Sequence, residues 1–283
     1  MGLREGGCSL IPIVSLGLYV EPVIHPKPGA VTALEAHGDK DVYDFLSNAS
    51  LVEYSLLESC RRGSIGAGLR AYRVMVSKLG LKTNIALGSL MLLAPIASVL
   101  RDLAGAPVRE ILEGAHRLVL EKTGKEEALE YYALLEYFSP SHLGKYYGPV
   151  PGVGSGSPNS LLEVLRAASW DMVHGELLKG YPITMEALKV IRESPGGLRE
   201  KALKTLLTIL SRHGDTLLAS KYGLTAYRIA RLEAERALKE ADFSLYEAVE
   251  RLDKLWRPRG WNPGAALDII ATAIGLYNYE KTC

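Results

Sequence analysis

Apolar residues recur along most of the chain at intervals of three and four, the period of an amphipathic helix. Glycines such as Gly80, Gly124 and Gly180 follow these segments, where helix ends are expected. The alternation typical of strands is nearly absent. The pattern predicts an all-α fold of about eleven helices, over residues 42–61, 65–79, 84–103, 107–123, 126–138, 160–179, 184–193, 198–212, 225–240, 244–256 and 263–279.

Three stretches need a separate interpretation. Residues 8–20 are apolar enough for a buried helix or strand, and residues 11–23 form the one stretch that could be extended. The residues before them carry no net positive charge, so we expect no export signal. The apolar run 85–100 is shorter than the ~20 residues that a membrane span needs, so we expect a core helix, kinked or broken near Pro95.

Residues 139–159 are rich in glycine, proline and serine. An irregular stretch of this length is uncommon inside a compact domain and often functional. Because the helical patterns on both sides have the same character, we predict a long loop over a single α-helical domain that spans residues 1–283, rather than a linker between two domains.

Composition narrows the choice of partners and compartment. The formal net charge is +1, with 48% hydrophobic and 23% charged residues, which is ordinary for a soluble globular protein. No global field attracts nucleic acid or an anionic membrane, so we predict neither as a partner. Cys8, Cys60 and Cys283 lie far apart and lack metal-ligand spacing. We therefore expect free thiols in a reducing compartment and a cytoplasmic location.

A carboxylate at Asp268 interrupts an otherwise small and apolar segment. Asn262 suits an N-cap and Pro263 the first helical position, so a helix is expected to begin there with Asp268 in its second turn. Burying a carboxylate is costly unless a partner holds it. The partner could be a cation, another helix N-terminus, or a metal or substrate.

Other polar residues stand out in the same way, and each has a simple structural explanation. Lys27 in a Pro-Gly turn could be solvated, Asn84 and Asp215 could cap helices, and Glu176 could lie on the surface. Taken together, carboxylates on several helices are how all-α proteins build Mg²⁺ sites, and a lysine on a fixed turn can hold phosphate. The set predicts a nucleotide site.

Short motifs follow one another in a fixed order over nearly the whole chain. They are Glu21 with Pro26-Lys27-Pro28-Gly29; His37 and Asp39 with Phe45 and Ser47; Asn84 with Ala94-Pro95; Gly175-Glu176 with Gly180-Tyr181-Pro182; Asp215-Thr216 with Lys221 and Gly223; and Asn262-Pro263-Gly264 with Asp268. In this order they resemble the triphosphoribosyl-dephospho-CoA synthase family (ATP:dephospho-CoA triphosphoribosyl transferase), in a divergent form similar to archaeal and methylotroph-type members.

The resemblance implies an all-α fold and a Mg²⁺-dependent transferase. ATP would donate its triphosphoribosyl group to a ribose hydroxyl of dephospho-CoA or a related acceptor, and adenine would leave. A homodimer is left open. The implied roles are catalytic for Asp39, His37 and Glu176, nucleotide-binding for Lys27, Asn84, Lys221 and Thr216, and metal-binding for Asp215, Asp268 and Glu176.

The chain also departs from the family pattern. Polar family positions are apolar at Ile85, Ala86, Ala265 and Ala266, and no arginine stands beside Glu176. These losses leave two alternatives open on the same helical fold. One is a nucleotide-binding protein without catalytic activity. The other is a Mg²⁺-dependent nucleotide hydrolase, in which water replaces the acceptor.

Overall fold

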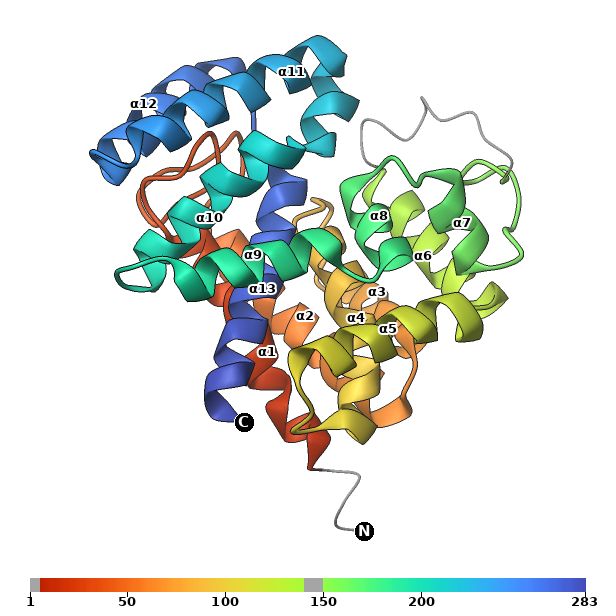
Figure 1. Cartoon of the computed structure of the whole chain (residues 1–283). Helices are drawn as coiled ribbons and strands as arrows, with labels where there is room; N and C mark the ends of the chain where they lie inside the picture. The colour runs from red at the N-terminus through yellow and green to blue at the C-terminus, as the bar shows by residue number, and fades with distance from the viewer. Residues whose placement is uncertain (1–5, 140–149) are drawn as a thin grey trace. The chain divides into compact units, whose positions relative to one another are not determined.

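Helices make up nearly all the regular structure of residues 6–139 and 150–283, which the computed structural model describes (Figure 1). Within these residues no β-strand forms, and a single bridge joins His37 to Lys40. The all-α prediction is confirmed. The α-helices are α1 (Ile11–Val20), α2 (Val42–Arg62), α3 (Ile65–Lys78), α4 (Leu87–Leu103), α5 (Val108–Lys122), α6 (Lys125–Phe138), α7 (Leu161–Ala167), α8 (Met172–Lys179), α9 (Pro182–Glu193), α10 (Leu198–His213), α11 (Thr216–Glu240), α12 (Leu245–Trp256) and α13 (Gly264–Thr282).

The helices group into two compact units, and short 3₁₀ helices η1 (Gly7–Leu10), η2 (Glu21–Val23) and η4 (Arg257–Arg259) complete them. Unit 1 comprises the described residues of Met1–Ser15, Asn48–Tyr181 and Tyr279–Cys283. Unit 2 comprises Leu16–Ser47 and Pro182–Asn278. Each unit is therefore assembled from segments that are distant in the sequence, and α1, α2 and α13 supply residues to both.

Unit 1 has α4 at its centre. Most of this helix is buried, and it packs against α3, α5 and α8. The helix continues through Pro95, so the expected break near that residue does not occur. Within the described residues, no single helix has both the length and the apolar character needed to cross a membrane, and α4 with α5 meets those two criteria only as a pair bent by 115°.

A disulfide between Cys8 and Cys60 joins η1 to the last turn of α2 in unit 1. Their Cα atoms are 5.7 Å apart, and both side chains are buried. Only Cys283 is a free thiol. The expectation of three free thiols was therefore wrong, because tertiary packing brings together two cysteines that the sequence keeps 52 residues apart.

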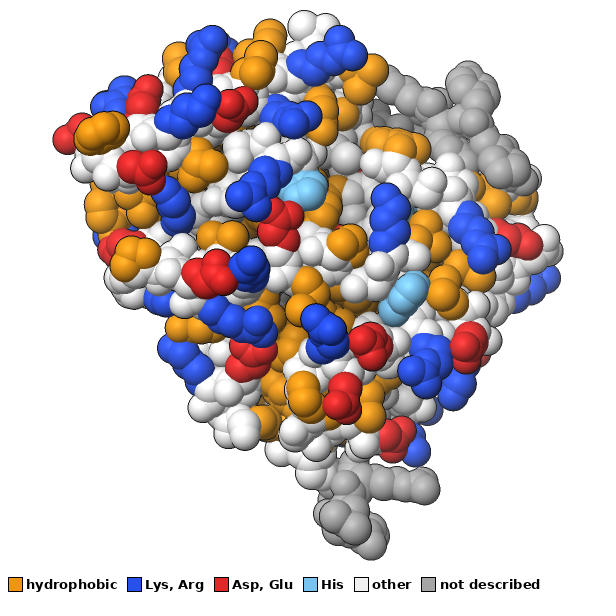
Figure 2. Space-filling view, viewed as in Figure 1, with side chains coloured by type: hydrophobic (Ala, Val, Ile, Leu, Met, Phe, Trp, Pro, Cys, Tyr) orange, Lys and Arg blue, Asp and Glu red, His pale blue; other side chains and the backbone are white. Residues whose placement is uncertain are grey.

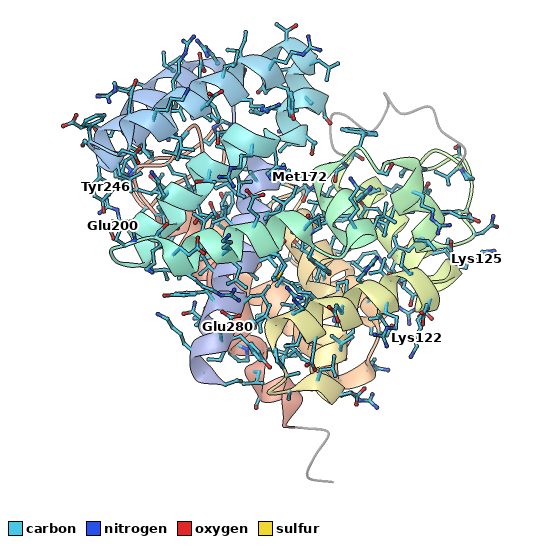
Figure 3. The ribbon with its side chains drawn as sticks, in the orientation of Figure 1. Lys122, Lys125, Met172, Glu200, Tyr246 and Glu280 are labelled. Atoms are coloured by element: carbon cyan, nitrogen blue, oxygen red, sulfur yellow. A yellow bond between two sulfur atoms is a disulfide. The ribbon has the colours of Figure 1, made fainter. Side chains whose placement is uncertain are left out.

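Unit 2 is built from α9 to α12, which pack in succession. Small residues form the buried seam of α11, where Ala226, Ala230, Ala234 and Ala237 recur at helical spacing. Tyr246 of α12 donates a hydrogen bond to the Glu200 carboxylate of α10, and the two labelled side chains lie together in Figure 3. These contacts fix α12, which supports the site described below.

The structure decides one open alternative and corrects two element predictions. Residues 11–23, for which both a helix and a strand were open, are helical, as α1 and η2. The predicted helix 160–179 is two helices, because Asp171 accepts hydrogen bonds from Val173 and His174 N–H and so begins α8 anew. The predicted helix 225–240 forms the part of α11 that follows a break at Gly223, where φ is 84°, and the helical part before the break, from Thr216, was not predicted. Of the predicted loop 139–159, residues 140–149 lie outside the described residues.

Candidate functional site

Lys27 of unit 2 is buried, with 2% of its surface exposed. Its Nζ donates to the Glu21 carboxylate and, at 2.8 Å, to the Glu21 carbonyl oxygen. Burial lowers the pKa of Lys27, and the neighbouring Glu21 carboxylate opposes that shift. The lysine is therefore not a solvated turn residue. It belongs to a buried ion pair that fixes the start of the Pro-Lys-Pro-Gly turn.

Gly29 ends this turn and cannot be replaced by a larger residue without rearrangement. Its φ of +61° is left-handed, and an added Cβ would lie 1.8 Å from the Trp261 carbonyl oxygen. Its N–H donates to Asp253 Oδ1 at 2.6 Å. The turn is thus fixed against the segment that follows α12.

His37 lies further along the same loop and is half-buried. Burial lowers its pKa, as do the charges of Arg257, Lys221 and Lys40, while a hydrogen bond to the Gly29 backbone opposes them. A neutral imidazole at this position can accept a proton. Asp39, the other candidate base, is exposed. Of the two predicted bases, His37 has the more structured surroundings.

Asp215 is 1% exposed and is shared by two helix N-termini of unit 2. Its Oδ1 accepts the N–H of Leu218 in α11 at 3.0 Å, and its Oδ2 accepts the N–H of Ala266 in α13 at 2.8 Å. The predicted cap of the following helix is confirmed. The second bond, to a residue 51 positions away, was not anticipated. The two peptide N–H groups and the helix dipoles stabilise the buried charge.

Thr216 and Lys221 lie on the first part of α11, between this cap and the break at Gly223. Thr216 is the first residue of the helix and is half-buried, whereas Lys221 is exposed. The side chain of Tyr222 donates to the Gly260 carbonyl oxygen at 2.7 Å. This bond anchors the chain beside Lys221 to the segment after η4.

Asp268 lies in the second turn of α13, as predicted, and is half-buried. The predicted cap was wrong, since α13 begins at Gly264 and Asn262 Oδ1 makes no hydrogen bond within the described residues. Asp215 instead provides the acceptor at this helix end. Two carboxylates are therefore associated with the first turns of α13.

A Mg²⁺ site was predicted from these carboxylates. Within residues 6–139 and 150–283, no three His, Cys, Asp or Glu side chains form a group that could hold a metal ion. The oxygens of Asp215 and Asp268 are the donor type that Mg²⁺ prefers, and Mg²⁺ commonly takes only one or two carboxylates beside substrate phosphates. Both Asp215 oxygens already accept peptide N–H groups, and the Mg²⁺ site stays a prediction.

Two predicted site residues lie in unit 1. Asn84 Oδ1 accepts the N–H of Leu87 at 3.3 Å, but the helix begins three residues later than predicted and its N-cap is Ala86. Glu176 is 1% exposed, which excludes the surface interpretation. Burial raises the pKa of Tyr181, and the Glu176 charge adds to the effect.

Sequence reasoning missed several polar residues around these positions. Asp253 and Arg257 form an ion pair one helical turn apart, which in a sequence looks like an ordinary surface pair. Lys40 was not singled out, although it is one of the cations close to His37. Tyr131 was also missed, and its hydroxyl lies 2.9 Å from Nε2 of the buried His174 in unit 1. No local signal marks these partners.

The fold and these side chains define an all-α protein that has buried carboxylates and, in unit 2, basic groups near one imidazole. On the face shown in Figure 2, Lys and Arg side chains are interspersed with Asp and Glu, in line with the formal net charge of +1. The cations that act on His37 are Arg257, Lys221 and Lys40. Such a group suits an anionic small molecule.

A family model described as ATP:dephospho-CoA triphosphoribosyl transferase matches residues 10–282. A Malonomonas rubra protein, proposed to be a 2-(5''-triphosphoribosyl)-3'-dephosphocoenzyme-A synthase, is 29% identical over 112 residues. That match spans 37% of this chain and only 35% of the relative. A crystal structure from Archaeoglobus fulgidus, proposed to be a triphosphoribosyl-dephospho-CoA synthase, has a TM-score of 0.64 at 20% identity, covering 82% of this chain and 97% of that one.

The family match extends over nearly the whole sequence, so the chain belongs to the ATP:dephospho-CoA triphosphoribosyl transferase family, a family of transferases. The structural likeness independently supports the fold. The resemblance drawn from the short motifs is confirmed.

Proposed function

We propose that this protein transfers the triphosphoribosyl group of ATP to a ribose hydroxyl of dephospho-CoA or a closely related acceptor. The observation that carries the proposal is the family match over residues 10–282. The neutral imidazole and the basic side chains of unit 2 support it, because the reaction needs a proton acceptor and cations facing a polyanion. Since ATP is an intracellular substrate, the proposal places the protein in the cytoplasm.

The proposed step is a substitution at C1′ of the ATP ribose. The bond from C1′ to N9 of adenine breaks, and a bond from C1′ to the acceptor oxygen forms, with oxocarbenium character between the two events. The acceptor hydroxyl proton passes to a base, for which we assign His37, with Asp39 as the alternative. The leaving adenine carries away the bonding electron pair at N9 and is then protonated.

We assign the triphosphate to Lys221 of unit 2, and the start of α11 at Thr216 to the same ligand. The nucleotide-binding role predicted for Lys27, which is buried in an ion pair with Glu21, stays a prediction. Mg²⁺, when bound, would supply positive charge to the triphosphate, and Asp215 and Asp268 are its proposed ligands in unit 2. The roles predicted for Glu176 and Asn84 in unit 1 stay predictions.

The test combines purified protein, ATP, Mg²⁺ and dephospho-CoA, with chromatography for adenine and mass spectrometry for the product. Acceptor-dependent release of adenine supports the proposal. No adenine with dephospho-CoA or with a panel of ribosylated acceptors overturns it. ADP or ribose triphosphate formed without acceptor indicates a hydrolase instead. Thermal stabilisation by ATP without turnover indicates a binding protein, which the apolar Ala265 and Ala266 would favour.

Asp268→Asn gives a residue-level test of the site. We expect loss of activity and of Mg²⁺-dependent stabilisation by ATP, with an unchanged fold, because the amide keeps the shape and removes the charge. The matched control is Asp242→Asn, which alters an exposed carboxylate paired with Lys204. Full activity in Asp268→Asn would assign that carboxylate a purely structural role.

A further inference from the structure

We propose that Arg257 is a positioning residue, which acts directly and through Asp253 to hold the loop that carries His37. The motif pattern that resembles the family gives no role to Arg257 or Asp253. The proposal rests on the proposed function only where it treats His37 as the base. The positioning itself rests on hydrogen bonds of Arg257 and Asp253 within unit 2.

Arg257 binds the loop that carries His37 from several directions. Its Nη1 donates to the Ala36 carbonyl oxygen at 2.7 Å, and its Nη2 donates to the Ala30 carbonyl oxygen at 3.0 Å. The same Nη2 lies 3.0 Å from the Glu35 carboxylate. Because the guanidinium is planar and its donors are fixed in a fork, these bonds define the path of residues 30–36.

Asp253 connects the guanidinium to the glycine turn. The Arg257 Nε lies 3.1 Å from Asp253 Oδ2, and Nη2 lies 3.0 Å from Oδ1. The same Oδ1 accepts the Gly29 N–H at 2.6 Å. Asp253 is 6% exposed, so these bonds are shielded from water. One buried carboxylate is therefore held by Arg257 on one side and holds the Gly29 peptide on the other.

The Ala36 carbonyl completes the connection, because it belongs to the peptide that precedes His37 and accepts the hydrogen bond from Arg257 Nη1. The position of Gly29 is independently restricted by the close approach of the Trp261 carbonyl oxygen. The loop that carries His37 is thus held at Gly29 by Asp253 and at Ala36 by Arg257. A shift of this loop would move the imidazole relative to any acceptor hydroxyl.

The charge of Arg257 acts on the same group. The charged side chains that act on His37 are Arg257 of η4, Lys221 of α11 and Lys40 of its own loop. All three disfavour the protonated imidazole. Asp253 and Glu35 offset part of the Arg257 charge. Arg257 therefore combines an orienting and an electrostatic effect, and substitution can separate the two.

The experiment uses the full-length protein with Arg257→Lys, which keeps the charge and loses the fork, and Arg257→Gln, which loses both. The matched control is Arg259→Gln, since the Arg259 guanidinium bonds to Glu233 at 2.8 and 2.9 Å. Circular dichroism verifies folding. The readouts are kcat and KM for ATP, the pH profile of kcat/KM, and the His37 pKa from NMR titration, with His37→Gln assigning the resonance.

We expect both Arg257 variants to lose roughly 100-fold in kcat, the scale of a misplaced catalytic group, with KM for ATP changed about threefold or less. Only Arg257→Gln should raise the His37 pKa and move the acid limb of the profile to higher pH, because one cation is removed. The control should stay within about twofold of wild type. Wild-type kcat and pH profile in both Arg257 variants would overturn the proposal.

The NMR titration separates this inference from the proposed function. If the wild-type protein shows no transferase activity, a raised His37 pKa and displaced His37 resonances in Arg257→Gln still support the positioning, and unchanged resonances reject it. If the wild-type protein is active and the Arg257 variants match it, the positioning fails while the transferase assignment stands.

Discussion

Opening the Cys8–Cys60 disulfide should destabilise the protein by a predictable amount. The bridge closes a chain segment with a sequence separation of 52 residues. In the loop-entropy description, a closure of that size removes about 14 cal/mol/K from the unfolded chain, or about 4 kcal/mol at 25 °C. With an unfolding entropy of ~2.1 cal/mol/K per residue over 283 residues, the loss corresponds to a decrease in Tm of about 7 °C.

The assay compares differential scanning calorimetry of the wild-type protein with that of a Cys8→Ala/Cys60→Ala double variant. The matched control is Cys283→Ala, which removes the exposed free thiol and should leave Tm unchanged. Thiol titration of the denatured, unreduced protein should find one reactive cysteine. Equal Tm values for the double variant and the wild type would refute the entropic reasoning, and three reactive thiols would refute the disulfide itself.

Further predictions concern stability. Gly29→Ala should lower the free energy of unfolding in urea by about 3 kcal/mol, because of left-handed backbone strain and the clash with the Trp261 carbonyl oxygen. A decrease below about 1 kcal/mol would contradict the described turn. Asp215→Ala should lower the free energy of unfolding by about 3 kcal/mol, since it leaves two buried N–H groups without an acceptor. Asp215→Asn should lower it less. Equal stability of Asp215→Ala and the wild type would exclude the double cap. Burial would raise the pKa of Glu130, but hydrogen bonds from two arginines hold that pKa below the ordinary 4.5. The ionised Glu130 carboxylate therefore stabilises the folded protein above pH 4.5, and this stabilisation is lost as the pH falls through the lowered pKa. Acid titration of Glu130→Gln should remove that dependence, and an unchanged acid transition would count against it.

Local patterns predicted most of the helices because their cause is local. A helix with one buried stripe shows that stripe in its sequence, as the buried positions of α5 do. α1 gave no such signal, because its residues are apolar on most sides and a strand was equally compatible with them. The division between α7 and α8 was missed for a similar reason, since Ala168 to Asp171 interrupt a pattern that continues on both sides.

The candidate site was predictable only in its residue types. The sequence identified Asp215 as a cap because α11 follows it directly, but the bond to Ala266 depends on how α13 packs. Lys27 was taken as a turn residue, and its burial against Glu21 follows from tertiary structure. Arg257 was missed altogether, because its partners Ala30 and Ala36 lie more than two hundred positions away in the chain.

The division of the chain between the two units affects the order in which the protein can fold during synthesis. Unit 1 begins before Leu16 and includes Tyr279, so all of unit 2 is synthesised between its first and last segments. The Tyr279 hydroxyl accepts the Gly105 N–H at 2.9 Å and donates to the Ala106 carbonyl oxygen at 3.0 Å. These bonds form only after all of unit 2 has been synthesised. Unit 1 is therefore completed after unit 2 has been made, although most of the residues of unit 1 are made first.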